Sequence, residues 1–344
     1  MVYLKHIICT AYKGGVKLTP MTPKERAIAA LTLQIPDQVP TFELGFTLAP
    51  EMFGINLYPS DLHRDVIHRL SPAEKDRKLN EVAADIAKVF EALDYCIIPG
   101  HFGAGYVDGA SISPERAFLF KKVRELINGR RLLGYSADGT FALTPRIRSG
   151  TESFAYRAAN DPAGLHTEAK QRMNTAIERN KNLAEAGIDV ALLCADYCDS
   201  TGPFCSQEHF EEFIQPYLAK IIEECKKSGM YTIKHSCGNI MPILDQIVAC
   251  KPHALHSLDP ACGVDIKEVK ARVGHKVALC GNVNCAILQS GTDEELIAGA
   301  TYCLTHAKPG GGYIFTTSNL PFRGVPPHRY QMILDVWKQM RDYT

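Results

Sequence analysis

The sequence lacks the features that mark several specialised classes of protein. It has no excess of charge, because 38 Lys and Arg residues balance 38 Asp and Glu residues, whereas nucleic-acid-binding proteins usually carry a basic excess. No window reaches the ~18 consecutive apolar residues of a membrane helix. Residues 1–17 lack the apolar run and the cleavage site of a secretory signal. We therefore expect a folded, soluble, cytoplasmic protein without nucleic-acid or membrane partners.

The 12 cysteines contain no C-x2-C pair, which argues against a structural zinc knuckle. In a long cytosolic chain, cysteines are more often buried thiols, metal ligands or reactive groups than disulfides. The cysteines of interest are those near the ends of predicted strands. The cysteines within apolar or helical stretches are interpreted as packing residues.

What the sequence does contain is a regular alternation of strand-like and helical segments. The predicted strands cover residues 39–45, 93–99, part of 131–144, 189–196, 231–237, 254–259, 276–280 and 312–317. The predicted helices cover a segment from Thr22 to before Ile35, then 71–93, 161–187, 207–228, 239–250, 264–273, 293–307 and 328–341. Apolar strands separated by helices indicate a parallel sheet buried on both faces. Eight such units predict an α/β fold of the (β/α)8 TIM barrel type.

An open doubly wound sheet is the alternative architecture. It is disfavoured because Glu43-Leu-Gly-Phe-Thr, after the first strand, does not match the glycine-rich dinucleotide fingerprint. Asp138-Gly139 lies between apolar-rich runs, a pattern that predicts an inserted antiparallel hairpin at 131–144. We expect a short N-terminal extension, residues 1–21, and one barrel domain at 22–344.

Polar side chains follow most of the predicted strands. Catalytic groups of such barrels lie at the carboxyl ends of the strands, where the loops meet. Any single polar strand end could equally be a solvated or capping side chain. The groups in question are Glu43, His101, Asp196, His235, Cys237, Asp259, Cys280, Asn282, Ser318 and Asn319.

His235-Ser-Cys237 is the sharpest of these features. Residues two apart on an extended strand point the same way, so the imidazole and the thiol face one point. Both are zinc ligands, and Cys280 ends another strand. Three protein ligands with one open position would form a catalytic zinc site. In the alternative interpretation, His235 makes a hydrogen bond in the core and both cysteines are packing residues.

Several short motifs, in this order, resemble the uroporphyrinogen decarboxylase superfamily, whose fold is a (β/α)8 barrel. They are Thr22-Pro-Lys-Glu-Arg, Pro36-Asp-Gln-Val-Pro, Gln215-Pro-Tyr, His235-x-Cys-Gly-Asn, Leu258-Asp, Gly281-Asn-Val and Gly291-Thr-Asp-Glu-Glu. The decarboxylases of the superfamily carry an arginine-rich stretch after the first strand that binds substrate carboxylates. Here that stretch, residues 42–50, contains no arginine, so a tetracarboxylate would lose its bidentate partners.

The resemblance therefore favours the other branch, the zinc-dependent corrinoid methyltransferases, and implies that His235 and Cys237 bind Zn2+. In that branch the third ligand is a cysteine after the last strand, where this sequence has Thr317-Ser-Asn319. Either Cys280 or an oxygen from Glu43, Asp196 or Asp259 would replace it, or the metal is lost. We prefer Cys280.

The implied activity is methyl transfer between a small O- or N-methylated substrate, or a thiol, and the cobalt of a corrinoid (cobalamin) carried by a partner protein. We expect the demethylating first enzyme, since the usual His/Cys/Cys set is not intact. The predicted catalytic residues are Asp196, Asp259 and Glu43. The predicted substrate-binding residues are His101, Tyr197, Phe204, Asn282 and Ser318.

Two other classes of function remain open. One is a decarboxylase-like carbon-carbon lyase that uses Asp196 and His101 without metal. The other is a non-enzymatic corrinoid-binding module, which is disfavoured because the sequence lacks the D-x-H-x-x-G loop of corrinoid carriers. The sequence leaves open the oligomeric state, including a homodimer.

Overall fold

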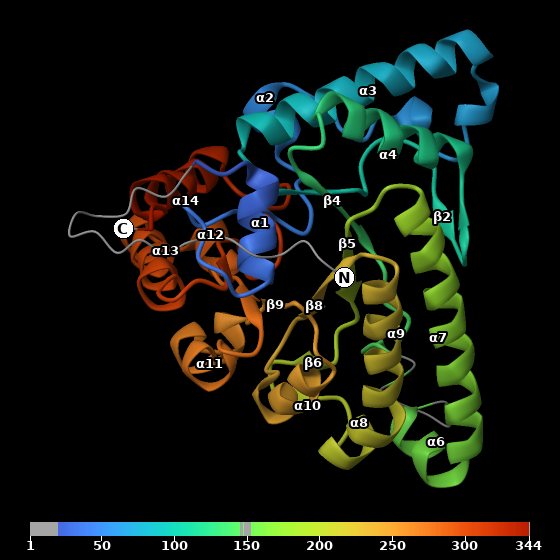
Figure 1. Cartoon of the computed structure of the whole chain (residues 1–344), viewed down its shortest axis with the longest axis vertical. Helices are drawn as coiled ribbons and strands as arrows, with labels where there is room; N and C mark the ends of the chain where they lie inside the picture. Colours follow the sequence, from blue (N-terminus) through green and yellow to red (C-terminus); the bar gives the residue numbers. More distant parts are fainter. Residues whose placement is uncertain (1–19, 145–146, 148–152, 344) are drawn as a thin grey trace, which may run out of the picture.

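The computed structural model describes residues 20–144, 147 and 153–343. Its centre is a parallel sheet in the order β1-β4-β5-β8-β9-β10-β11. Helices surround these strands (Figure 1). The strands are β1 (Ile97–Pro99), β4 (Leu132–Ser136), β5 (Val190–Cys194), β8 (Tyr231–Ser236), β9 (Ala254–Ser257), β10 (Ala278–Cys280) and β11 (Tyr313–Ile314). The predicted TIM-barrel class is confirmed.

The segment predicted as the first strand, residues 39–45, closes the sheet. Thr41 forms parallel bridges to both Tyr95 and Phe315, and the backbone N–H of Phe315 donates to the carbonyl of Pro40 at 2.9 Å. The segment does not extend into a longer ladder with either neighbour, and Thr41 forms one isolated bridge to each. One reason is that Pro40 has no N–H to donate to a ladder.

The predicted helices begin within two residues of their predicted starts, whereas the helices at Ala49–Phe53, Pro114–Leu126 and Phe154–Asn160 were not predicted. Thr22, Ser71 and Thr292 each form a capping box with a glutamate three residues later. Of the predicted helices, residues 207–228 split into two at Ile214, and 239–250 begins as a 3-10 turn. The helices are α1 (Pro23–Leu31), α2 (Ala49–Phe53), α3 (Pro72–Ala92), α4 (Pro114–Leu126), α6 (Phe154–Asn160), α7 (Pro162–Glu185), α8 (Gln207–Phe213), α9 (Gln215–Lys227), α10 (Leu244–Ala249), α11 (Ile266–Val273), α12 (Cys285–Ser290), α13 (Asp293–Ala307) and α14 (Pro327–Met340).

The hairpin predicted at Asp138-Gly139 does not form there. Residues 132–136 are β4, a parallel barrel strand, and no strand follows in 137–144. Asp138 instead turns inward, where its buried carboxylate pairs with Lys234 at 2.8 Å. Antiparallel hairpins occur elsewhere, between β2 (Val107–Asp108) and β3 (Ser111–Ile112), and between β6 (Cys198–Asp199) and β7 (Gly202–Pro203).

The two ends of the described chain meet at one side of the barrel. Helix α1 contacts β11, and in Figure 1 it lies near the orange and red C-terminal helices. Of the arm predicted at 1–21, residues 1–19 fall outside the described part of the chain. The division into an arm and a single barrel domain stays a prediction. No helix of the described residues has the length and apolarity needed to cross a bilayer.

Candidate metal centre and substrate cavity

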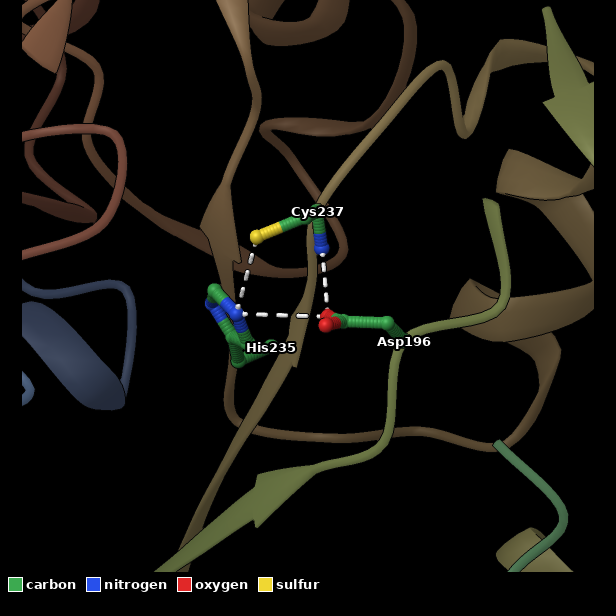
Figure 2. A group of neighbouring side chains, drawn as sticks. All are labelled: Asp196, His235 and Cys237. Atoms are coloured by element: carbon green, nitrogen blue, oxygen red, sulfur yellow. Dashed lines mark hydrogen bonds and ion pairs between the residues drawn. The ribbon is translucent and has the colours of Figure 1, made fainter. Parts of the chain in front are cut away.

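Three potential metal ligands meet at the carboxyl ends of two neighbouring strands: Asp196, His235 and Cys237 (Figure 2). The Nε2 atom of His235 lies 3.4 Å from Sγ of Cys237 and 3.4 Å from Oδ1 of Asp196. The His235 side chain is buried, and Asp196 is partly open to solvent. The three side chains therefore present one nitrogen, one sulfur and one oxygen to a common point.

The sheet register explains this meeting. His235 is part of β8, and Cys237 follows the end of that strand. Strand β5 pairs directly with β8, with Cys194 opposite His235, so Asp196 leaves β5 beside them. The backbone N–H of Cys237 donates to Oδ1 of Asp196 at 2.8 Å. This bond holds the loop after β5 against the loop after β8.

The spacing of the three atoms fits a zinc-sized cation. Zinc bonds are about 2.0–2.1 Å to nitrogen, 2.3 Å to sulfur and 2.0–2.2 Å to oxygen. In a tetrahedron, such bonds place the ligand atoms roughly 3.3–3.6 Å apart. The two separations of 3.4 Å at Nε2 of His235 agree with this value. The donor types and these two separations are compatible with Zn2+, and all three ligand atoms lie within 4.8 Å of one another.

The electrostatics of the group follow from its partners. Burial alone would raise the pKa of Asp196, but the interaction with His235 and the hydrogen bond from the backbone N–H of Cys237 overcome it and lower the pKa to about 2. Burial, together with the charges of Asp196 and Asp259, raises the pKa of Cys237 to about 12. The thiol must therefore lose its proton when a cation binds.

A second histidine, which the sequence analysis missed, lies behind the first. His256 on β9 is opposite His235 in the register, and the two Nδ1 atoms are 2.8 Å apart. His256 is fully buried. The sequence showed only that His256 lies within a predicted strand. It did not show which neighbouring strand the imidazole ring would face.

A cavity of 330 Å³ opens beside the group, a size within the usual range of about 300–1,000 Å³ for small-molecule sites. Among the described residues, the lining contains no lysine or arginine. Its residues are Leu44, Gly45, Thr47, Tyr58, His101, Ser136, Cys194, Asp196, His235 and Leu320. Both Asp196 and His235 line it, so a small molecule in the cavity would touch the candidate metal centre.

His101, predicted to bind substrate, also lines this cavity. Its ring packs against Tyr135 with centroids 4.7 Å apart. Burial, helped by the charge of Arg116, lowers the pKa of His101 to about 4. The imidazole is therefore neutral near pH 7 and can donate or accept one hydrogen bond.

The structure does not bring Cys280 to the other two predicted ligands. Its thiol is fully buried and is absent from the group formed by the described His, Cys, Asp and Glu residues. The reason is topological, because β9 lies between β8 and β10. The neighbour that does reach His235 is Asp196, one of the oxygen alternatives.

Glu43 and Asp259, predicted to be catalytic, lie in other surroundings. Oε2 of Glu43 accepts hydrogen bonds from the hydroxyls of Thr316 at 2.8 Å and Thr317 at 2.6 Å, which tie the first segment of the barrel to the last. Asp259 accepts from the backbone N–H of Ala261 at 3.0 Å and caps a 3-10 turn. Neither residue lines the cavity.

Four predicted substrate-binding residues also lie outside the cavity lining. Tyr197 is buried, with its hydroxyl 2.7 Å from that of Thr140, and Phe204 packs on Phe154. The side chain of Asn282 donates to the carbonyl of Leu258 at 2.6 Å. Ser318 accepts from the backbone N–H of Cys285 at 3.4 Å. These contacts give each side chain a packing or backbone-fixing role in this structure.

Asn319 contacts the site more directly than its neighbour Ser318. Its Nδ2 donates to Sγ of Cys237 at 3.3 Å. Because the oxygen and nitrogen of an amide exchange by a simple flip, the same side chain could present its oxygen to a cation. Its place after the last strand was visible in the sequence, but its contact with Cys237 was not.

Comparison with known proteins places these features in context. A family model described as "Uroporphyrinogen decarboxylase (URO-D)" matches residues 121–340. A uroporphyrinogen decarboxylase from Anaeromyxobacter dehalogenans is 28% identical over 207 residues, 59% of this chain and 57% of the relative. The chain thus aligns with less than two thirds of that relative's length.

Two further similarities extend over more of the chain. A methylcobamide:CoM methyltransferase from Methanosarcina mazei is 24% identical over 317 residues, 82% of this chain and 89% of the relative. The solved structure of a methyltransferase from Methanosarcina mazei covers 93% of this chain and 99% of its own, with a TM-score of 0.65 at 18% identity. The latter likeness shows a shared fold.

Proposed function

The chain belongs to the uroporphyrinogen decarboxylase family, and we propose that within this family it is a zinc-dependent methyltransferase that exchanges a methyl group with a corrinoid protein. The observation that carries the proposal is the triad of His235, Cys237 and Asp196 beside a small cavity. The likeness to the methylcobamide:CoM methyltransferase supports it, because the alignment covers most of both chains.

The residues of the centre and of the cavity would have different tasks. His235, Cys237 and Asp196 would hold the cation, with a fourth position left for a ligand from the cavity. When bound, such a cation supplies a Lewis acid that stabilises charge on the heteroatom released from the methyl group. Leu44 and Leu320 give the cavity apolar walls, and His101 offers one neutral hydrogen bond to orient the substrate.

The demethylating direction is the one we propose. The methyl group would pass from the substrate to the cobalt of the partner's corrinoid, the carbon–oxygen or carbon–nitrogen bond would break with its electron pair on the heteroatom, and that atom would take a proton from water. A centre with one thiolate and one carboxylate is harder than a His/Cys/Cys centre. Such a donor set favours stabilising a leaving oxygen or nitrogen over activating a thiol.

The metal-free lyase is disfavoured by the cavity. Tetracarboxylate substrates are held by cationic side chains, and no lysine or arginine is found in the described lining. Residues 42–50, which follow the first segment of the barrel, also contain no arginine. The lyase remains the outcome to expect if the purified protein binds no zinc.

Zinc quantitation tests the centre. We expect one equivalent of zinc in the wild type, and loss of most of it in Cys237→Ala and Asp196→Asn. Matched controls are Cys194→Ser, a thiol of the same cavity outside the triad, and Asp259→Asn, a nearby carboxylate. Cys280→Ala should keep its zinc. Absence of stoichiometric zinc in the wild type would overturn the proposal.

A methyl-transfer assay tests the reaction. The zinc-loaded protein is mixed with reduced cobalamin and a panel of methyl ethers and methylamines, and the absorbance of methyl-cobalt is followed. We expect at least one methyl donor to form methyl-cobalt in the wild type and none to do so in Cys237→Ala. Activity only with methylcobalamin and a thiol would reverse the proposed direction while keeping the centre.

A further inference from the structure

His256 is in direct contact with a proposed metal ligand, yet it is not itself part of the ligand group. It lies on β9 opposite His235, with the two Nδ1 atoms 2.8 Å apart and the ring planes inclined by 41°. Its other ring nitrogen, Nε2, is buried and has no hydrogen-bond partner among the described residues. Among the described residues, the only polar contact of this buried ring is therefore the one with His235.

A contact between two imidazole nitrogens has only two neutral arrangements. One nitrogen must carry the proton and the other must accept it. Nε2 of His235 faces Sγ of Cys237 and Oδ1 of Asp196, and it can bind a cation only through its lone pair. In that state the proton of His235 is on Nδ1, and the acceptor has to be His256.

The ring of His256 is fully buried, and no carboxylate contacts it among the described residues. Phe42 packs edge-on against it at 6.0 Å. A neutral partner also differs from the carboxylate that often accepts from a zinc-bound histidine, because it adds no negative charge to a centre that already contains a thiolate and a carboxylate.

We propose that His256 is a positioning residue for the metal centre: its Nδ1 accepts the Nδ1–H of His235 and so selects the tautomer whose Nε2 lone pair faces Cys237 and Asp196. The proposal rests on the metal centre of the proposed function. Because the acceptor is uncharged, the two negative ligands balance a divalent cation and the centre keeps its Lewis acidity.

Zinc affinity of His256 variants tests this assignment. His256→Phe keeps the ring volume and removes the acceptor, whereas His256→Gln keeps an acceptor oxygen. His253→Phe is the matched control, because His253 accepts from the backbone N–H of Thr232 at 3.0 Å and lies outside the metal group. Zn2+ dissociation constants are measured by competition with a chromophoric chelator, with thermal melts to verify folding.

We expect His256→Phe to bind Zn2+ about 10–100-fold more weakly than the wild type, His256→Gln to recover part of the loss, and His253→Phe to match the wild type. In the metal-free wild type, 15N NMR of the imidazoles should already place the proton of His235 on Nδ1, and metal-free His256→Phe should lose that preference. That spectrum reports the tautomer directly, which a merely structural role of His256 does not predict.

The outcomes separate this inference from the proposed function. If the wild type binds no zinc, the metal centre itself is wrong. If the wild type binds zinc but folded His256→Phe binds it equally well, or the NMR spectrum of the metal-free wild type places the proton of His235 on Nε2, only the role of His256 is overturned. Loss of zinc in His256→Phe and His256→Gln alike, with normal melts, would also contradict an acceptor role.

Discussion

The side-chain amide of Asn319 donates a hydrogen bond to Sγ of Cys237 at 3.3 Å. Asn319 follows the last strand segment of the barrel, the region in which the zinc-dependent methyltransferases that this sequence resembles carry a cysteine ligand. In this chain an amide, and not a sulfur, therefore contacts the thiol of Cys237, a proposed zinc ligand. The candidate centre is completed instead by Asp196 from the neighbouring strand.

Asn319→Cys should add a second sulfur to the centre. A thiolate is a stronger ligand for Zn2+ than a neutral amide, so we expect zinc to bind roughly 10-fold more tightly or better. The Co2+-loaded variant should show stronger sulfur-to-cobalt absorption in the near ultraviolet than the wild type. Asn319→Ser is the control for loss of the amide alone. An unchanged cobalt spectrum would mean that position 319 cannot reach the cation.

His101→Phe should weaken substrate binding without changing the chemistry. The substitution keeps an aromatic ring against Tyr135 and removes one hydrogen bond, which is worth about 1 kcal/mol. We expect KM for the methyl donor to rise by about 5-fold at constant kcat. Steady-state kinetics with the donor found in the screen give both constants. A fall in kcat at constant KM would assign His101 to the chemical step instead.

Lys234→Met should destabilise the fold strongly. Nζ of Lys234 donates to Asp138 and to the carbonyls of Leu193 and Ala195, and it lies 4.1 Å from the ring centre of Tyr197. Removing it leaves the buried carboxylate of Asp138 without its cation, which typically costs about 3–5 kcal/mol. Denaturant unfolding of the metal-free protein measures the loss in the free energy of unfolding.

The double variant Lys234→Met with Asp138→Asn is the control for that experiment. It removes the stranded charge, so it should be more stable than Lys234→Met alone. If the single substitution costs less than about 1 kcal/mol, water reaches the Asp138 carboxylate and the pair is not a buried one.

Glu43 should make the stability of the fold depend on pH. Burial, partly offset by hydrogen bonds from Thr316, Thr317 and Tyr330, raises the pKa of Glu43 to about 8. At pH values above about 4.3, the ordinary pKa of a glutamate side chain, the unfolded state has lost this proton. The folded state keeps the proton up to about pH 8. The free energy of unfolding contributed by this group is fully present below about pH 4.3 and is lost as the pH rises towards about 8.

Glu43→Gln should flatten this dependence. The wild type is expected to lose up to about 1.4 kcal/mol per pH unit between pH 5 and 8 from this group, and the glutamine variant is expected to lose none of it. Urea midpoints of both proteins at pH 6 and pH 8 provide the comparison. Parallel losses in the two proteins would show that Glu43 is already ionised in the fold.

Much of the fold could be predicted from local patterns. Thr22, Ser71 and Thr292 are helix caps that act through hydrogen bonds within four residues, so their effect is legible in the sequence. Asp138-Gly139 shows the limit of such patterns. Its turn signal is outweighed by a contact with Lys234, a residue 96 positions away.

The site was predictable only in part, because some of its contacts join residues that are far apart in the sequence. His235 and Cys237 share one strand end, so their common direction follows from the two-residue repeat of extended backbone. Their partner comes from another strand, and nothing local distinguishes Asp196 from Cys280 or Asp259. The same limit hid His256, whose polar contact with His235 crosses from β9 to β8.

The sequence by itself determined the alternation of most barrel strands and helices and the pairing of His235 with Cys237, because both depend on periodicity and short-range hydrogen bonds. The tertiary structure alone decided which third group completes the centre. Strand β5 is hydrogen-bonded to β8, whereas β9 separates β8 from β10. Strand neighbourhood therefore brings the carboxylate of Asp196 to within 3.4 Å of His235 and keeps the thiol of Cys280 out of the group.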